Sequence, residues 1–218
     1  MNAMISLSEM LKTQIEASKS FLPESTSKFI RMEAGKFVDN IGGTSSFIEG
    51  IILDFVQVNS FYKSAFNPAV KQIPICVAIG LDEMTDLKPV KESTMPQHGG
   101  TCGTCPHNAW GSGSGKGKRC KNSYRVAIIP VGETSPQAVK ILNVPPASMA
   151  NLGNYVRSLR ATNRWLPMVV TRVAFDQSTT YAKLTFTETR PADNLDALNA
   201  AYQEAQTMLR EPYGLKDA

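Results

Sequence analysis

The sequence predicts a mainly β protein of the α+β class, with an OB-like or open β-barrel and flanking helices. Three observations support this prediction. Short β-rich runs recur along the chain, amphipathic helical patterns lie at both ends and once between strands, and one long aperiodic stretch interrupts the strands. The chain has 218 residues, of which 42% are hydrophobic and 19% are charged, and this is enough to bury a core. We therefore expect a single domain over residues 1–218.

The first half of the chain is expected to contain one helix followed by strands. Apolar residues at helical spacing predict a short amphipathic helix over residues 4–20, before Pro23. Alternating residues on both sides of a turn at Gly35 predict two short strands within 30–38. The longest β-rich run follows at 47–58, and a further strand is expected at 73–79.

The second half is expected to combine strands with two helices. Pro145 and Pro146 precede a helical pattern, and the sequence DQST predicts the turn of a β-hairpin. The elements are expected in the following order: strands at 124–130 and 138–144, a helix from Pro146, hairpin strands at 167–175 and 181–187, and a C-terminal helix and tail within 191–218.

Residues 80–122 form an insertion with almost no periodicity and many Gly, Ser, Lys and Pro residues. A structureless stretch of that length is rare in a compact domain unless something other than an apolar core organises it. Three of the four cysteines lie in this stretch: Cys102, Cys105 and Cys120. We therefore expect a zinc-binding insertion within the domain.

The spacing of the cysteines favours a structural zinc site. Cys102 and Cys105 form a CxxC pair, and Cys120 follows after 14 residues. A CxxC turn places two thiolates on one metal ion with little strain, and zinc accepts four soft ligands in tetrahedral geometry. Because four protein ligands leave no open position, the ion is expected to stabilise the insertion rather than to catalyse a reaction.

The fourth ligand has three candidates, namely Cys76, His98 and His107. We favour Cys76, because a bond from the strand at 73–79 would attach the insertion to the β-sheet. His107 lies only two residues after Cys105, so chelation of the same ion would strain the turn. Two alternatives stay open: Cys76 as a buried core thiol, and the CxxC pair as a redox site, although the βαβ pattern typical of such sites is absent.

A basic, glycine-rich segment surrounds Cys120. The net charge is only +4, yet five basic residues fall within ten positions: Lys116, Lys118, Arg119, Lys121 and Arg125. Glycines let a backbone approach phosphates, cations neutralise them, and aromatic rings stack on exposed bases. The candidate stacking residues are Tyr62, Trp110 and Tyr124. The pattern predicts sequence-tolerant binding of single strands, and the alternative is a solvated basic loop.

Signatures of other functions are scarce. The chain contains no GxSxG, HExxH or Walker A motif, so we expect a protein that is not an enzyme. Asp82 and Glu83 are adjacent, but a Mg²⁺-dependent nuclease needs carboxylates gathered from several positions. Charged residues within the N-terminal apolar pattern argue against a signal peptide, and no apolar run approaches the roughly 18 residues of a membrane span.

Several ordered motifs resemble a family of phage and prophage proteins described as single-stranded DNA-binding. They are Gly35-Lys36-Phe37, IILDFVQVN, Phe61-Tyr62, the lone Cys76, Pro96-Gln97, CGTCPHNAWGS and GKGKRCKNSYRVAII. The resemblance covers residues 28–130 well and 146–188 more loosely. It implies an OB-like protein that coats single-stranded DNA during phage replication or recombination in the host cytoplasm. It also implies Cys76 as the fourth zinc ligand.

The chain departs from the family pattern at its C-terminal tail, and alternative functions stay open. Many phage single-strand binders end in an acidic tail that recruits partners, whereas this chain ends in the mixed-charge sequence EPYGLKDA. Contacts with replication or recombination proteins and self-association are therefore open. The second hypothesis is a zinc-containing accessory protein that binds a host or phage protein, and the third is a nucleic-acid enzyme.

Overall fold

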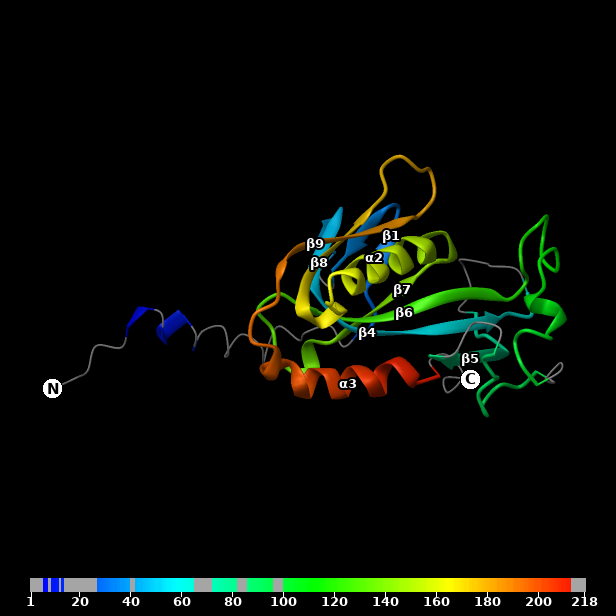
Figure 1. Ribbon diagram of the computed structural model, residues 1–218, viewed down its shortest axis with the longest axis horizontal. Helices are drawn as coiled ribbons and strands as arrows, with labels where there is room; N and C mark the ends of the chain where they lie inside the picture. The colour runs from blue at the N-terminus through cyan, green and yellow to red at the C-terminus, as the bar shows by residue number, and fades with distance from the viewer. Residues whose placement is uncertain are drawn as a thin grey trace.

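The computed structural model describes residues 6–7, 9–11, 13, 27–39, 42–64, 72–81, 86–95 and 100–212. A six-stranded antiparallel sheet forms the body of the protein (Figure 1). The strand order is β7-β6-β4-β8-β9, and β5 also pairs with β4. The strands are β4 (Phe47–Phe61), β5 (Cys76–Gly80), β6 (Lys121–Pro130), β7 (Lys140–Val144), β8 (Val169–Phe175) and β9 (Leu184–Pro191).

Strand β4 is the central strand of this sheet, and it pairs with three other strands. Its 15 residues are rich in Ile, Val and Phe, which fit a buried pleated surface. The first part of β4 pairs with β8, its last five residues pair with β5, and β6 accompanies it along both parts. The register ends with Phe61 opposite Cys76, so β4 and β5 carry the sheet out to the cysteine-containing segment.

Two helices cover opposite faces of the sheet (Figure 1). Helix α2 (Met149–Ala161) buries Leu152 and Leu159 against one face, and helix α3 (Asn199–Arg210) buries Ala205 and Leu209 against the other. Short 3-10 helices complete the chain: η1 (Pro106–Asn108), η2 (Pro136–Ala138), η3 (Pro146–Ser148), η4 (Leu166–Met168) and η5 (Leu195–Leu198). None of the described helices combines the length and apolar character needed to span a bilayer.

A small three-stranded sheet lies before β4 in the chain. It consists of β1 (Arg31–Glu33), β2 (Lys36–Val38) and β3 (Thr44–Ser45). Ala34 and Gly35 join β1 to β2 with φ angles of 48° and 74°, which is the left-handed geometry of a tight hairpin turn. Phe37 anchors this sheet to the main core, with its ring centroid 4.8 Å from that of Phe175.

The predicted class is confirmed: the protein is mainly β with a few helices, consistent with α+β. The barrel part of the prediction is not confirmed. Within the described residues β7 and β9 lie at opposite ends of the strand order and do not pair, so the sheet is open. Strand β5 begins at Cys76, three residues later than the strand expected at 73–79.

Candidate nucleic-acid interface and metal centre

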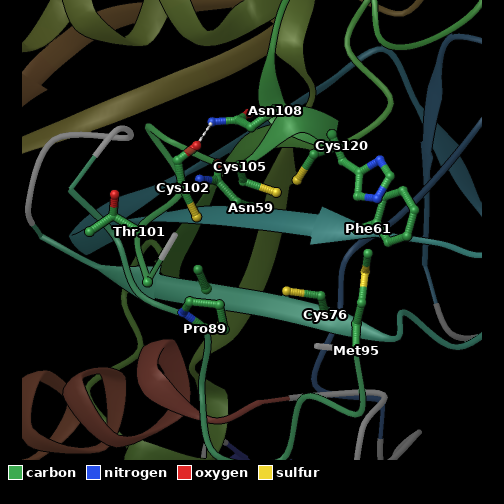
Figure 2. Close-up of a pocket in the computed structure, with 13 residues that line it drawn as sticks. Asn59, Phe61, Cys76, Pro89, Met95, Thr101, Cys102, Cys105, Asn108 and Cys120 are labelled. Carbon is green, nitrogen blue, oxygen red and sulfur yellow. Dashed lines mark hydrogen bonds between the residues drawn. The ribbon is translucent and has the colours of Figure 1, made fainter. Parts of the chain in front are cut away.

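The four cysteines line one cavity of about 30 Å³ at the end of the sheet (Figure 2). Cys76 comes from β5, Cys102 and Cys105 come from the loop before η1, and Cys120 immediately precedes β6. Residues of β4 and β5 line the cavity from the sheet side. The four thiols that the sequence analysis favoured as zinc ligands, spread over 44 residues of chain, therefore line one cavity.

Backbone hydrogen bonds fix the loops that carry the thiols. The Cys102 amide donates to Leu87 O at 2.8 Å, and the Cys120 amide donates to His107 O at 2.8 Å. Pro106 begins the single turn of η1, and the Asn108 amide closes that turn onto Cys105 O at 2.9 Å. Cys105 and Cys120 are therefore both held by the η1 turn, while Cys102 is held by the backbone of Leu87.

The donor set suits zinc, but the side chains are not placed as a closed site. Four thiols around one small cavity are the ligands that structural zinc prefers. As placed, however, no three His, Cys, Asp or Glu side chains within the described residues form a group that could hold a metal ion. The thiols would have to turn further into the cavity to bind one ion together.

Burial controls the protonation of these thiols. Burial raises the pKa of Cys120 to about 12, and the neighbouring thiols Cys102, Cys76 and Cys105 add to the shift. Burial also raises the pKa of Cys76 and of Cys102. Hydrogen bonds from Ser93 to Cys76 and from Asn59 to Cys102 act in the opposite direction.

Of the two histidines and the acidic pair considered in the sequence, only His107 lies within the described residues. His107 lines the same cavity as the cysteines, and its ring stacks on Phe61 with centroids 4.3 Å apart and planes inclined by 15°. The other candidate ligand, His98, lies outside the described residues, and so do Asp82 and Glu83.

Three asparagines connect the cysteine loops to the sheet, and the sequence analysis did not single them out. Asn108 donates from Nδ2 to Cys102 O at 2.9 Å, and its Oδ1 accepts from Asn122 Nδ2 at 3.0 Å. Asn122 also donates to the Asn59 side chain on β4. Lys118 Nζ joins this network by donating to Asn122 Oδ1 at 3.0 Å. Only the position of Asn108 in CGTCPHN offered a sequence signal.

The basic segment forms a closed loop rather than an extended arm. The amides of Gly111 and Gly113 both donate to Gly117 O at 3.0 Å, and the Arg119 amide donates to Ser112 Oγ at 3.0 Å. A Cβ atom on Gly113 would lie 3.0 Å from the backbone of Lys118, so the two sides of the loop approach closely. These contacts fix the backbone of the loop that carries Lys116, Lys118 and Arg119.

An open groove of about 440 Å³ lies beside the cysteine cavity. Four basic side chains contribute to it: Lys63, Lys118, Arg119 and Lys121. The remaining lining residues are polar or aromatic and no described carboxylate is among them: Tyr62, Ser64, Gln72, Ser112, Gly113 and Ser114. A groove of this composition presents positive charge and hydroxyl donors to an anionic ligand.

Aromatic rings position two of the groove cations. The Lys121 ammonium lies 5.4 Å from the centroid of the Tyr62 ring, and the Arg119 guanidinium lies 5.4 Å from that of Phe61. Both distances fall within the range of cation–π attraction. Lys63 and Gln72 were missed by the sequence analysis, although Lys63 directly follows the Phe61-Tyr62 motif.

Not all of the predicted binding residues lie in the groove. Lys116 is exposed at the loop tip, outside the lining. Trp110 is 80% exposed, and its ring centroid lies 5.2 Å from the Lys118 ammonium, so it borders the groove. Tyr124 is half-buried, and its ring packs edge-on against that of Phe55, with the centroids 5.4 Å apart. Both rings lie on the face of the sheet that α2 covers.

Arg125 has a different role from the predicted contact with phosphate. It is only 6% exposed, and its Nη1 donates to Leu209 O at 3.0 Å and to Glu211 O at 2.7 Å. These carbonyls lie at the C-terminal end of α3, where helix carbonyls lack partners within the helix. Arg125 therefore ties α3 to β6, because its side chain points into the α3 face of the sheet.

Comparison of the chain with protein-family models, curated proteins and solved structures finds no match.

Proposed function

We propose that this protein binds single-stranded DNA without strong sequence preference, and that the groove beside the cysteine cavity holds the phosphate backbone. One observation carries the proposal: Lys63, Lys118, Arg119 and Lys121 line a single groove, with no described carboxylate among its lining residues. Phosphates neutralised by such side chains release counterions, which favours binding. The motifs that resemble those of phage single-stranded DNA-binding proteins support a role in DNA replication or recombination.

The aromatic residues favour a single strand over a duplex. Trp110 is largely exposed beside Lys118, and Tyr62 lines the groove itself. Rings in such positions stack on the faces of unpaired bases, whereas duplex bases are already stacked on each other. Each base–ring stack contributes about 1–3 kcal/mol and tolerates any base, which accounts for weak sequence preference.

We also propose that Cys76, Cys102, Cys105 and Cys120 hold one structural zinc ion. The four thiols line one cavity, and the chain reaches the groove directly from it because Arg119 and Lys121 flank Cys120. A bound ion would fix the backbone at Cys120 and hence the two groove cations beside it. The ion would have no part in a chemical reaction.

Fluorescence anisotropy with labelled oligonucleotides tests the proposed function. Wild-type protein should bind a single strand more tightly than a duplex of the same length. The variant K63Q/R119Q/K121Q, which removes three groove cations, should lose most of this affinity. A matched variant, K36Q/K91Q/R210Q, removes three exposed cations outside the groove and should retain most of it.

Two results would contradict the proposal. One is equal binding of single strands and duplexes, or no binding, at low salt. The other is an equal loss of affinity in the two triple variants, because that would assign binding to net charge rather than to the groove. Capture of a specific protein partner without DNA binding would favour the accessory-protein hypothesis.

A further inference from the structure

A second, apolar groove lies on a different part of the protein, between the small sheet and the main sheet. It has a volume of about 460 Å³. Its apolar walls are formed by side chains of β2, β4, β6 and the segment that precedes β1: Phe29, Ile30, Phe37, Val38, Ile48 and Ile128. A groove of this size and composition is suited to several apolar side chains.

The polar groups at its rim are already engaged by the protein itself. Lys140 Nζ donates to Ser27 O at 3.2 Å, and Asp39 Oδ1 accepts from the Gly43 amide at 2.6 Å. Glu49 Oε1 accepts from Arg172 Nε at 2.9 Å. What the groove offers to a ligand is therefore mainly apolar surface, which favours an apolar peptide over a polar small molecule.

The N-terminal segment carries a matching apolar face. Residues 7, 9–11 and 13 are helical, and Ser6 and Glu9 cap the start of the helix. The Ser6 amide donates to Glu9 Oε2 at 3.0 Å, and the Glu9 amide donates to Ser6 Oγ at 3.3 Å, which is a capping box. Leu7, Met10 and Leu11 share one face and are 67%, 47% and 48% exposed.

We propose that this N-terminal helix docks into the apolar groove of its own chain, with Leu7, Met10 and Leu11 facing the groove. The connecting residues 14–26 end at Ser27, which itself lines the groove. Fully extended, thirteen residues span at most about 45 Å, which sets the upper limit of the helix's reach from Ser27.

The short connection also favours the same chain over a second copy. A ligand attached through so few residues has an effective concentration on the order of millimolar at a site within its reach. At micromolar protein concentration, a helix from another molecule competes poorly with the attached one. Docking within one chain covers the apolar face of the helix and the apolar groove. This contact does not join two copies of the protein.

Photo-crosslinking of the full-length protein tests this proposal. With Leu11 replaced by p-benzoylphenylalanine, we expect crosslinks within one chain, to peptides that contain residues 28–49 or 128–130. The same photoreactive group at Thr13, on another side of the helix, should give few crosslinks to these peptides. The additional change Leu7→Asp should abolish the crosslinks, whereas Ser8→Asp should preserve them.

Two outcomes would overturn the proposal. Crosslinks between two chains, seen as a covalent dimer, would assign the groove to a second copy. An absence of crosslinks to the groove peptides, in a protein whose circular dichroism matches the wild type, would show that the helix does not occupy this groove. Neither outcome depends on DNA binding, so the result is independent of the proposed function.

Discussion

Arg125 shows how one residue in a basic segment can serve the fold instead of the ligand. It lies four positions after Lys121, yet its side chain points to the α3 face of the sheet, whereas Lys121 lines the groove. A buried guanidinium requires hydrogen-bond partners, and the last carbonyls of α3 supply them. The local charge count therefore overestimates the number of side chains that can contact phosphate.

Replacement of Arg125 should accordingly affect stability. Arg125→Met leaves the carbonyls of Leu209 and Glu211 without this donor, so we expect the free energy of unfolding to fall by about 2–4 kcal/mol. Arg160→Met is the matched control, because Arg160 is exposed on α2. Urea unfolding measures both variants. A loss of DNA affinity at unchanged stability would contradict the role assigned to Arg125.

Replacement of Trp110 should instead affect DNA binding and not stability. Because its side chain is 80% exposed, Trp110→Ala should leave the free energy of unfolding nearly unchanged. It should weaken single-strand binding by about 1–3 kcal/mol, or roughly 5- to 150-fold, through the loss of one stack. The control is Trp165→Ala, at the other tryptophan, outside the groove. Equal losses of affinity in the two variants would contradict stacking on Trp110.

At the scale of elements, the hairpin of β8 and β9 depends on a charged turn. Asp176 Oδ1 accepts from the amide and the hydroxyl of Ser178 at 3.0 and 2.6 Å, and its Oδ2 lies 3.1 Å from Lys183 Nζ. These contacts lower the pKa of Asp176 to about 2, with the Ser178 side chain as the largest cause. The turn is thus stabilised by the ionised carboxylate.

This lowered pKa predicts an acid-sensitive hairpin. A carboxyl group whose pKa is lower in the folded protein contributes stability above its unfolded-state pKa, and loses that contribution as the pH falls toward the folded-state value. We expect amide exchange in residues 176–183 to become faster, relative to the rest of the sheet, as the pH falls from about 4 to about 2. Asp176→Asn should remove this pH dependence. An unchanged profile in that variant would assign the effect to another group.

At the same scale, zinc binding by the cysteine loops can be tested directly. Purified protein should contain about one zinc ion per chain, and removal by a chelator should speed amide exchange in residues 100–120 while the circular dichroism of the sheet persists. Cys76→Ser should lower the zinc content, whereas His107→Gln should preserve it. Retention of zinc in Cys76→Ser and its loss in His107→Gln would identify His107 as the fourth ligand. Full protection of residues 100–120 without zinc would contradict the structural role.

Local pattern predicted most of the elements, because alternation and helical spacing are properties of neighbouring residues. The strands near 47–58 and 124–130 were found this way, although β4 extends to Phe61 and β6 begins at Lys121. The order of the strands was not predictable, since it depends on pairings such as that of β4 with β8, more than 100 residues apart. For that reason the sequence analysis expected a barrel, whereas the described strands form an open sheet.

The candidate site was predictable to a similar extent. Cysteine spacing favoured Cys102, Cys105 and Cys120 as one group, because a CxxC turn is local, and these thiols line one cavity with Cys76. Lys63 and Gln72 reach the groove only through the fold of the chain after β4, which no local pattern shows. The burial of Arg125 did have a signal: it directly precedes the apolar run VAII, whose residues the structure buries on both faces of the sheet.

At the scale of the whole molecule, the small net charge of +4 conceals an uneven distribution. Helix α3 covers one face of the sheet and α2 the other, while the cysteine loops extend from the far end of β4 and β5 (Figure 1). The groove cations gather at that end. The core and the proposed DNA-binding surface are therefore separate, so that variants of the groove can be compared without loss of the fold.

The salt dependence of single-strand binding tests the central claim most directly. Each neutralised phosphate contributes about −0.7 to the slope of log K against log salt, so four groove cations predict a slope near −3 for the wild-type protein. The K63Q/R119Q/K121Q variant should reduce its magnitude by about 2, and the K36Q/K91Q/R210Q variant should leave it nearly unchanged. A slope near zero for the wild-type protein, or equal slopes for all three proteins, would contradict the assignment of DNA binding to this groove.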